Sequence, residues 1–210
     1  MKYSIVIPYY KRRTLYNTFV SYLEFYRNRD DFEIIIIEDK KNIDDEHLEL
    51  LRIINKFSSS SLNIRYFTSD LDTFNPSPYF NRGVELSKGD YILITNPECL
   101  HTVDILSELD KIFDLNENTY VICSCINVKS MGNVDNIMDF QYIPATLKGP
   151  NHKRIFHEHE KMRFGELKIN SNYEWYQHVK YNNRGLHFCT AISKTNFQRL
   201  GGFDEEYMKG

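Results

Sequence analysis

The sequence predicts an α/β fold in which an open, mixed and mainly parallel sheet is flanked by helices. Short apolar runs of strand length alternate with longer amphipathic stretches, which is typical of βαβ units with right-handed crossovers. The run FEIIIIED at residues 32–39 is apolar almost throughout, as in a strand of a parallel sheet that is buried on both faces. Several of the runs end in polar or acidic residues, and open parallel sheets bind ligands at these carboxyl ends.

Each element follows from its local pattern. The first strand, YSIVIPYY from residue 3, is expected to end at Pro8, because proline cannot donate to a central ladder. Leu15, Phe19, Tyr22 and Tyr26 recur at helical spacing and predict a helix over 14–29. The later expected elements are a helix capped by Asp44 or Asp45, an edge strand LNIRYF (62–67), a helix over 79–88 closed by Gly89, the strand DYILIT (90–95), a helix over about 102–114, and the strands TYVICSCINV (119–128) and LHFCTAIS (186–193).

Composition narrows the class of protein. A chain of 210 residues with 41% hydrophobic content can form one large domain. Its net charge of -3 argues against a nucleic-acid binder, and the cations at 11–13 are interpreted as a solvated helix start. The four cysteines form no CxxC pair, which favours buried thiols in a reducing compartment. Because no signal-peptide core or membrane-length apolar run is present in the sequence, we expect a cytoplasmic protein without a membrane span.

From about residue 129 to 184 the regular pattern is lost, and the sequence is rich in His, Asn, Tyr and Lys. Long irregular stretches inside a compact domain are usually functional or disordered. The HEHEK run at 157–161 does not have the HExxH spacing of zinc proteases. We therefore expect a loop region here and no zinc site.

Three predicted strands end in distinctive polar residues, namely Pro8-Tyr9-Tyr10, Glu38-Asp39 and Asn96-Pro97-Glu98. In a parallel sheet these ends share one edge, where a ligand would bind. The sequence has no glycine-rich phosphate loop. The phosphates of a bound nucleotide would then need a divalent cation, Mg²⁺ or Mn²⁺, held by a carboxylate such as Glu98. Alternatively, Glu98 balances the dipole at the start of the next helix.

Four segments in order carry a family resemblance: SIVIPYYKR, FEIIIIED, NPSPYFNRGVELSKGDYILITNPE and HFCTAISKTNFQRLGGFDEEY. Over about residues 3–126 and 186–207 they resemble the GT-A-fold glycosyltransferases of family 2. The resemblance implies a single GT-A-like domain over 1–210. Residues 1–126 would be its Rossmann-like, nucleotide-sugar-binding half, and residues 127–210 an irregular acceptor-side half with a long loop.

The resemblance also implies roles for individual residues. Asp39 would read the nucleobase edge and Glu38 would help at the ribose. Asn96 takes the place of the first acid of the DxD motif and Glu98 that of the last acid, which contacts the metal. The other residues implied at the donor site are Pro8, Tyr9 and Tyr10 around the base and Asn81 on the helix lining the donor. Apart from the resemblance, His178 and His187 lie near the motif-bearing segments, and either one could complete a donor metal site. The tyrosines could instead pack at the sheet rim, and Asn81 could cap backbone groups.

The activity implied is transfer of a sugar from a nucleoside diphosphate, UDP being favoured, to a hydroxyl acceptor with inversion. Mn²⁺ or Mg²⁺ would assist, although Asn96 lacks the charge of the usual acid. The family's catalytic base usually follows GGFDE in an acidic pair. Here Asp204 or Glu205 takes that role, or the base lies in a longer protein beyond Gly210; the two acids could otherwise cap a helix.

Two other functions compete with this one. The first is a non-catalytic module of the same fold that binds nucleotide sugars or glycans, which the missing DxD acid favours. The second is a nucleotidyltransferase that makes nucleotide sugars. That class needs a glycine-rich basic loop after the first strand, and the sequence PYYKRR at that position argues against it.

Overall fold

The computed structural model describes residues 1–12, 14–40, 45–71, 75–101, 103–126, 175–177 and 187–206. The chain forms two compact units, one made of Met1–Ile122 with His187–Gly210 and the other of Cys123–Leu186. The HEHEK run and almost all of the predicted acceptor-side loop lie outside the described residues. In the second unit, β6 (Cys125–Ile126) and β7 (Trp175–Gln177) pair in antiparallel orientation.

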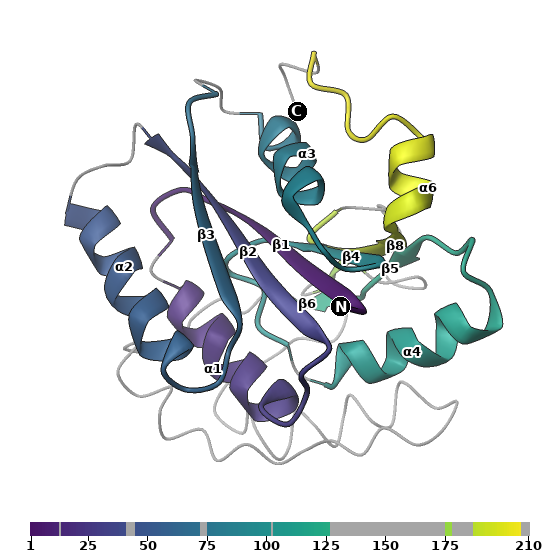
Figure 1. Cartoon of the computed structure of the whole chain (residues 1–210), viewed down its shortest axis with the longest axis horizontal. Helices are drawn as coiled ribbons and strands as arrows, with labels where there is room; N and C mark the ends of the chain where they lie inside the picture. The colour runs from purple at the N-terminus through teal and green to yellow at the C-terminus, as the bar shows by residue number, and fades with distance from the viewer. Residues whose placement is uncertain are drawn as a thin grey trace. The chain divides into compact units, whose positions relative to one another are not determined.

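The first unit contains a six-stranded sheet with the order β3-β2-β1-β4-β8-β5 (Figure 1). The parallel part consists of β1 (Tyr3–Tyr9), β2 (Phe32–Asp39), β3 (Ile64–Ser69) and β4 (Tyr91–Thr95). The strands β8 (Cys189–Ser193) and β5 (Val121–Ile122) continue it in antiparallel orientation. The predicted open, mixed and mainly parallel sheet is therefore confirmed.

Helices cover both faces of this sheet (Figure 1). One face carries α1 (Leu15–Tyr26), α2 (Asp45–Ser58) and α4 (Ile105–Leu115), and the other carries α3 (Ser77–Leu86) and α6 (Lys194–Arg199). The core under α3 and α6 includes Val6, Phe80, Ile94 and Phe197. A Cβ on Gly83 of α3 would lie 2.2 Å from Val6 Cγ1, so this glycine allows the close packing of helix on strand. In the described parts of the chain, no helix is long and apolar enough to cross a membrane.

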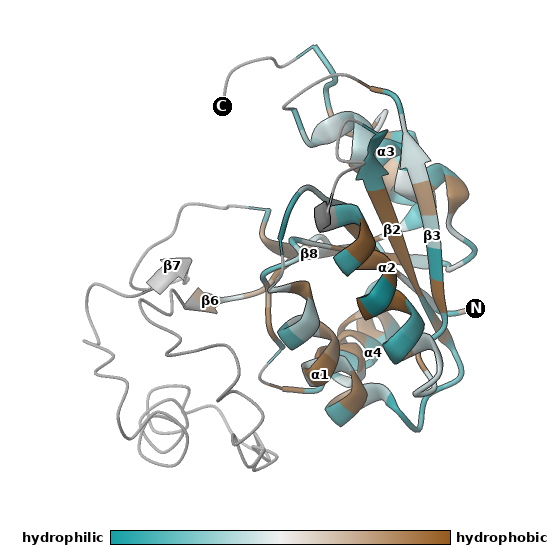
Figure 2. Cartoon of the chain, turned by 90° about the vertical axis from the view of Figure 1, so that its left-hand side faces the viewer, coloured by the Kyte–Doolittle hydropathy of each residue, from teal (hydrophilic) through white to brown (hydrophobic). Residues whose placement is uncertain are grey.

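Strand β2 is buried along its whole length, as its apolar sequence predicts. Figure 2 shows it brown along the body and teal at the arrowhead, where Glu38 and Asp39 end it. Strand β3 lies at the sheet edge and is mostly half-buried, which also agrees with its alternating sequence. The apolar core of the sheet therefore ends, on this side, in the polar residues at the carboxyl ends of β2 and β3.

Two predicted boundaries are wrong. Strand β1 runs through Pro8 to Tyr9, because the ladder to β4 has already ended at Val6 and Pro8 has a partner strand on one side only. The run TYVICSCINV is not one strand. It is split into β5 and β6, which belong to different compact units, so Cys123 and Cys125 do not share a strand. All four cysteines are free thiols, as predicted, but only Cys189 is buried; the other three are half-buried.

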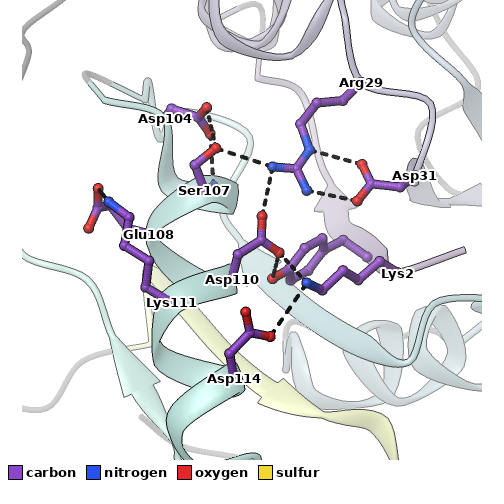
Figure 3. Close-up of polar contacts among 10 residues, drawn as sticks. Lys2, Arg29, Asp31, Asp104, Ser107, Glu108, Asp110, Lys111 and Asp114 are labelled. Carbon is purple, nitrogen blue, oxygen red and sulfur yellow. Dashed lines mark hydrogen bonds and ion pairs between the residues drawn. The ribbon is translucent and has the colours of Figure 1, made fainter.

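At the amino edge of the sheet, an ionic network joins α4 to the start of β1 and to the turn before β2 (Figure 3). Arg29 binds both carboxylate oxygens of Asp31 at 2.9 and 2.7 Å and reaches Asp110 at 3.1 Å. Hydrogen bonds from Arg29 lower the pKa of Asp31 against the opposing effect of burial. Burial raises the pKa of Asp110, but hydrogen bonds from Lys2, Tyr3 and Arg29 outweigh it, and the pKa is lowered.

This network predicts how stability depends on pH. A carboxyl whose pKa is lower in the folded state adds stability above its unfolded pKa of about 3.9, and that stability is lost as the pH falls through the folded pKa. We expect Arg29→Met to be less stable than wild type at neutral pH, and the difference to shrink below about pH 4. Urea unfolding at a series of pH values measures it. A difference that stays constant across the series contradicts the prediction, and Lys111→Met, in an exposed pair with Glu108, is the control.

Candidate functional site

The strand order changes direction between β1 and β4, and this is where an open α/β sheet binds its ligand. Strands β2 and β3 lie on one side of β1, and β4 lies on the other. Tyr9 is paired with Glu38, and Val6 with Ile94. The Pro8–Tyr10 turn therefore lies between the ends of β2 and β4, so the structure brings all three predicted strand ends to one edge.

On the β2 side, the turn offers one exposed aromatic ring. Tyr9 is 2% exposed and belongs to the core, whereas Tyr10 is 50% exposed. The Lys11 ammonium lies 5.9 Å from the centre of the Tyr10 ring, and Lys11 has a φ of 48°, which is strained for a residue other than glycine. Asp39 is 8% exposed at the end of β2. Of the two tyrosines, only Tyr10 is placed to stack on a ligand.

Glu38 points to the opposite face of β2 from Asp39, because side chains alternate along a strand. Its carboxylate is fully buried and accepts hydrogen bonds from Tyr66 of β3 at 2.5 Å and from His47 of α2 at 2.8 Å. Burial raises the pKa of Tyr66, and the neighbouring Glu38 raises it further. Glu38 thus joins α2 to the sheet beneath the site. Sequence reasoning did not include His47 and Tyr66, which lie 9 and 28 residues from Glu38 along the chain.

Glu98 stands in an exposed turn after β4, with its side chain 41% exposed. The helix-dipole alternative for it is wrong, because α4 begins at Ile105 and its cap is Asp104, which accepts from the Ser107 amide at 2.9 Å. Arg12 Nε lies 3.9 Å from Glu98 Oε2. Sequence reasoning treated Arg12 as a solvated helix start; its place in a basic run after β1 was the available signal.

His187 lies at the same edge, just before β8. The backbone N–H of Asn96 donates to the Phe188 carbonyl at 3.0 Å. This bond joins the chain next to His187 to the end of β4. His187 Nδ1 is hydrogen-bonded to the Tyr120 hydroxyl, and burial lowers the pKa of the imidazole. A neutral imidazole with one nitrogen so engaged keeps the other for a ligand.

The turn after α6 is held by Asn81 of α3. The Asn81 amide donates to the Phe203 carbonyl and accepts from the Phe203 N–H, both at 2.9 Å, and donates to Glu205 Oε1 at 2.7 Å. Gly202 has a φ of 76°, and a Cβ there would lie 2.7 Å from Asn81 Oδ1. Asn81 therefore binds the backbone of this turn, and places Asp204 and Glu205 beside α3.

The side chains at the switch point fit a divalent cation that takes most of its ligands from substrate phosphates and water, and only a few from the protein. Across the described residues, no three His, Cys, Asp or Glu side chains gather to hold a metal ion by themselves. One carboxylate, Glu98, with the Asn96 amide two residues before it, is a donor set for Mg²⁺ or Mn²⁺ when substrate phosphates and water supply the remaining oxygens.

The fold and its polar strand ends together define a mixed α/β domain with a polar site at its topological switch point. The chain belongs to glycosyl transferase family 2, whose family model matches residues 4–185. That range includes the irregular middle of the sequence and ends before the LGGFDEE turn. Membership in this family confirms the predicted family and the GT-A-type fold.

Solved structures share the fold at low sequence identity. The chain is 17% identical to S. aureus TarS 1-349 in complex with UDP-GlcNAc, with a TM-score of 0.54 over 63% of this chain and 36% of that one. It is 12% identical to the mannosyltransferase PcManGT from Pyrobaculum calidifontis in complex with GDP-Man and Mn²⁺, with a TM-score of 0.59 over 98% of this chain and 48% of that one. The chain thus spans less than half of these proteins. No curated protein matches it.

Proposed function

We propose that the protein transfers a sugar from a nucleoside diphosphate sugar to a hydroxyl group of an acceptor. The observation that carries the proposal is the placement of Asp39 and Glu98 at the carboxyl ends of β2 and β4, on either side of the exposed Tyr10. The solved structures of similar fold support it, because they are complexes with the nucleotide sugars UDP-GlcNAc and GDP-Man.

Tyr10 stacks on the nucleobase and Asp39 accepts a hydrogen bond from its edge. We favour uracil as the base, because its single N3–H needs only one acceptor oxygen of Asp39. The N1–H and N2–H groups of guanine together need two. Measured affinities for UDP and GDP decide between the two bases.

Glu98 and Asn96 would hold the divalent cation at the diphosphate, and His187, at the same edge of the sheet just before β8, would add a nitrogen ligand. When bound, the cation supplies positive charge that stabilises the leaving diphosphate. Arg12 lies beside Glu98, and its guanidinium adds positive charge to that of the cation. These side chains would bind the donor and orient its anomeric carbon for attack by the acceptor.

In the transfer step, the acceptor oxygen attacks the anomeric carbon as the bond to the diphosphate breaks, and the configuration inverts. A carboxylate takes the proton of the acceptor hydroxyl. Asp204 is better placed for this role than Glu205. Glu205 already accepts from Asn81, whereas exposed Asp204 uses one oxygen for the Glu206 amide and keeps the other.

A binding module without turnover is the second candidate. The observations that favour it are Asn96, which brings no charge to the cation, and the engagement of Glu205 by Asn81. Incubation with UDP-GlcNAc and GDP-Man, with and without Mn²⁺, separates the candidates. Release of nucleoside diphosphate, with or without an acceptor product, supports the transferase. Saturable binding with no release supports the binding module, and no binding of either donor contradicts both.

Replacement of Asp39 by alanine should weaken UDP binding by about 1–3 kcal/mol, the cost of one charge-assisted hydrogen bond. Isothermal calorimetry with wild type and variant measures it. Asp70→Ala is the matched control, because Asp70 is an exposed carboxylate at the end of β3 that pairs with Lys40. Equal affinities of wild type and Asp39→Ala would remove Asp39 from the site.

A further inference from the structure

Helix α1 carries an unusual set of buried hydroxyl groups. Thr18, Ser21 and Tyr26 are 1%, 2% and 0% exposed and lie on the side of the helix that faces the turn after β4. Buried hydroxyls are unfavourable unless they form hydrogen bonds. An amphipathic helix that only had to cover a sheet would place apolar side chains here.

All three hydroxyls bind the same segment, residues 96–101. Thr18 Oγ1 donates to the Pro97 carbonyl at 2.7 Å. Ser21 Oγ accepts from the His101 amide at 3.0 Å. The Tyr26 hydroxyl is 2.7 Å from His101 Nδ1. Burial lowers the pKa of His101 to about 3, so its imidazole is neutral and bonds as a fixed part of the core.

The other side of this segment is held by the residues that precede β8. The backbone N–H of Asn96 and the thiol of Cys99 both donate to the Phe188 carbonyl, at 3.0 and 3.2 Å. Within the segment, the Cys99 amide donates to the Asn96 carbonyl at 3.1 Å, which closes a tight turn around Pro97 and Glu98. Of this turn, Glu98 carries the exposed carboxylate.

We propose that Thr18 is a positioning residue that sets where the Glu98 carboxylate meets the cation of the donor, with Ser21 supporting the same turn. The inference rests on the proposed function. Residues 96–101 form no helix or strand, so no backbone ladder fixes their position. The Pro97 carbonyl that accepts the Thr18 hydrogen bond belongs to the peptide group shared with Glu98. Loss of the Thr18 hydrogen bond therefore lets Glu98 move relative to the diphosphate.

The test compares Thr18→Val, which keeps the shape but loses the donor, with Thr18→Ser, which keeps the donor. The measured quantity is the ratio of the UDP dissociation constants without and with Mn²⁺. We expect Thr18→Val to reduce this ratio roughly tenfold, as for one lost buried hydrogen bond, with little change in the metal-free constant. Thr18→Ser should restore the wild-type ratio, and Ser21→Ala is a second variant with the same expected direction.

Ser87→Ala is the matched control. Ser87 is buried and donates to the Val84 carbonyl at 2.6 Å, but it lies at the C-terminal end of α3, away from the turn after β4. Its replacement should lower the unfolding temperature without changing the ratio. A Thr18→Val ratio equal to wild type overturns the inference and leaves the proposed function standing. A wild type that binds UDP with no gain from Mn²⁺ overturns it as well, and a wild type that binds neither UDP nor GDP overturns the proposed function itself.

Discussion

Replacement of Glu98 by glutamine should lower the rate of sugar transfer by about 10²–10³, the effect of removing one group that stabilises developing charge in a transition state. Glutamine keeps the size of the side chain but removes the negative charge, and Asn96 is a neutral amide that cannot replace it. The gain in UDP affinity that Mn²⁺ provides should disappear in the variant. The metal-free affinity should stay close to wild type, because Asp39 and Tyr10 are unchanged.

Steady-state kinetics and calorimetry across a Mn²⁺ series measure these effects. Glu108→Gln is the control, because Glu108 is an exposed carboxylate on α4 that pairs with Lys111. Transfer that is equally fast in the Glu98 variant, or a Mn²⁺ response that survives in it, would show that the cation is held by other groups.

Replacement of Arg65 by methionine should destabilise the fold by about 3–5 kcal/mol, the typical cost of breaking a buried ion pair by removing one partner. Arg65 of β3 donates to Glu33 Oε2 at 2.8 Å, and the Glu33 side chain is fully buried. Burial raises the pKa of Glu33, but hydrogen bonds from Ser4 and Arg65 outweigh it and the pKa is lowered. In the variant, a buried carboxylate would remain without its cation.

Chemical denaturation of wild type and variant measures the loss. Arg52→Met is the matched control, because Arg52 forms an exposed pair with Glu49 on α2 and should change stability by less than ~1 kcal/mol. The double variant Arg65→Met with Glu33→Gln should lose less than the sum of the single variants, because the two groups interact directly. Additive losses would mean that Arg65 stabilises the sheet without Glu33.

Much of this protein could be predicted from local sequence patterns. The pattern of apolar residues identifies β2 as a fully buried strand and α1 as an amphipathic helix. A strand buried on both faces is apolar at every position, whereas a helix buried along one stripe is apolar at every third or fourth position. The meeting of Asp39, Tyr10 and Asn96 at one edge also follows from sequence. Once strands are known to be parallel, their carboxyl ends must lie together.

The partners of the polar residues were decided by the tertiary structure alone. Glu38 and Asp39 are adjacent and both acidic, yet Glu38 is held by His47 and Tyr66 inside the fold, whereas Asp39 lies at the carboxyl edge of the sheet, at the end of β2. Asn81 binds Phe203, which is 122 residues away along the chain.

Thr18 likewise reaches Pro97 across 79 residues. Hydrophobic burial is averaged over many contacts and shows as a repeating pattern, whereas a hydrogen bond joins two particular atoms within about 3 Å. The sequence by itself therefore determined the parallel strands, the helices that cover them and the edge where the site lies, but not the division of residues 119–128 between β5 and β6. Which polar side chains support that edge and which face the ligand depends on atomic distances that only the packed chain sets.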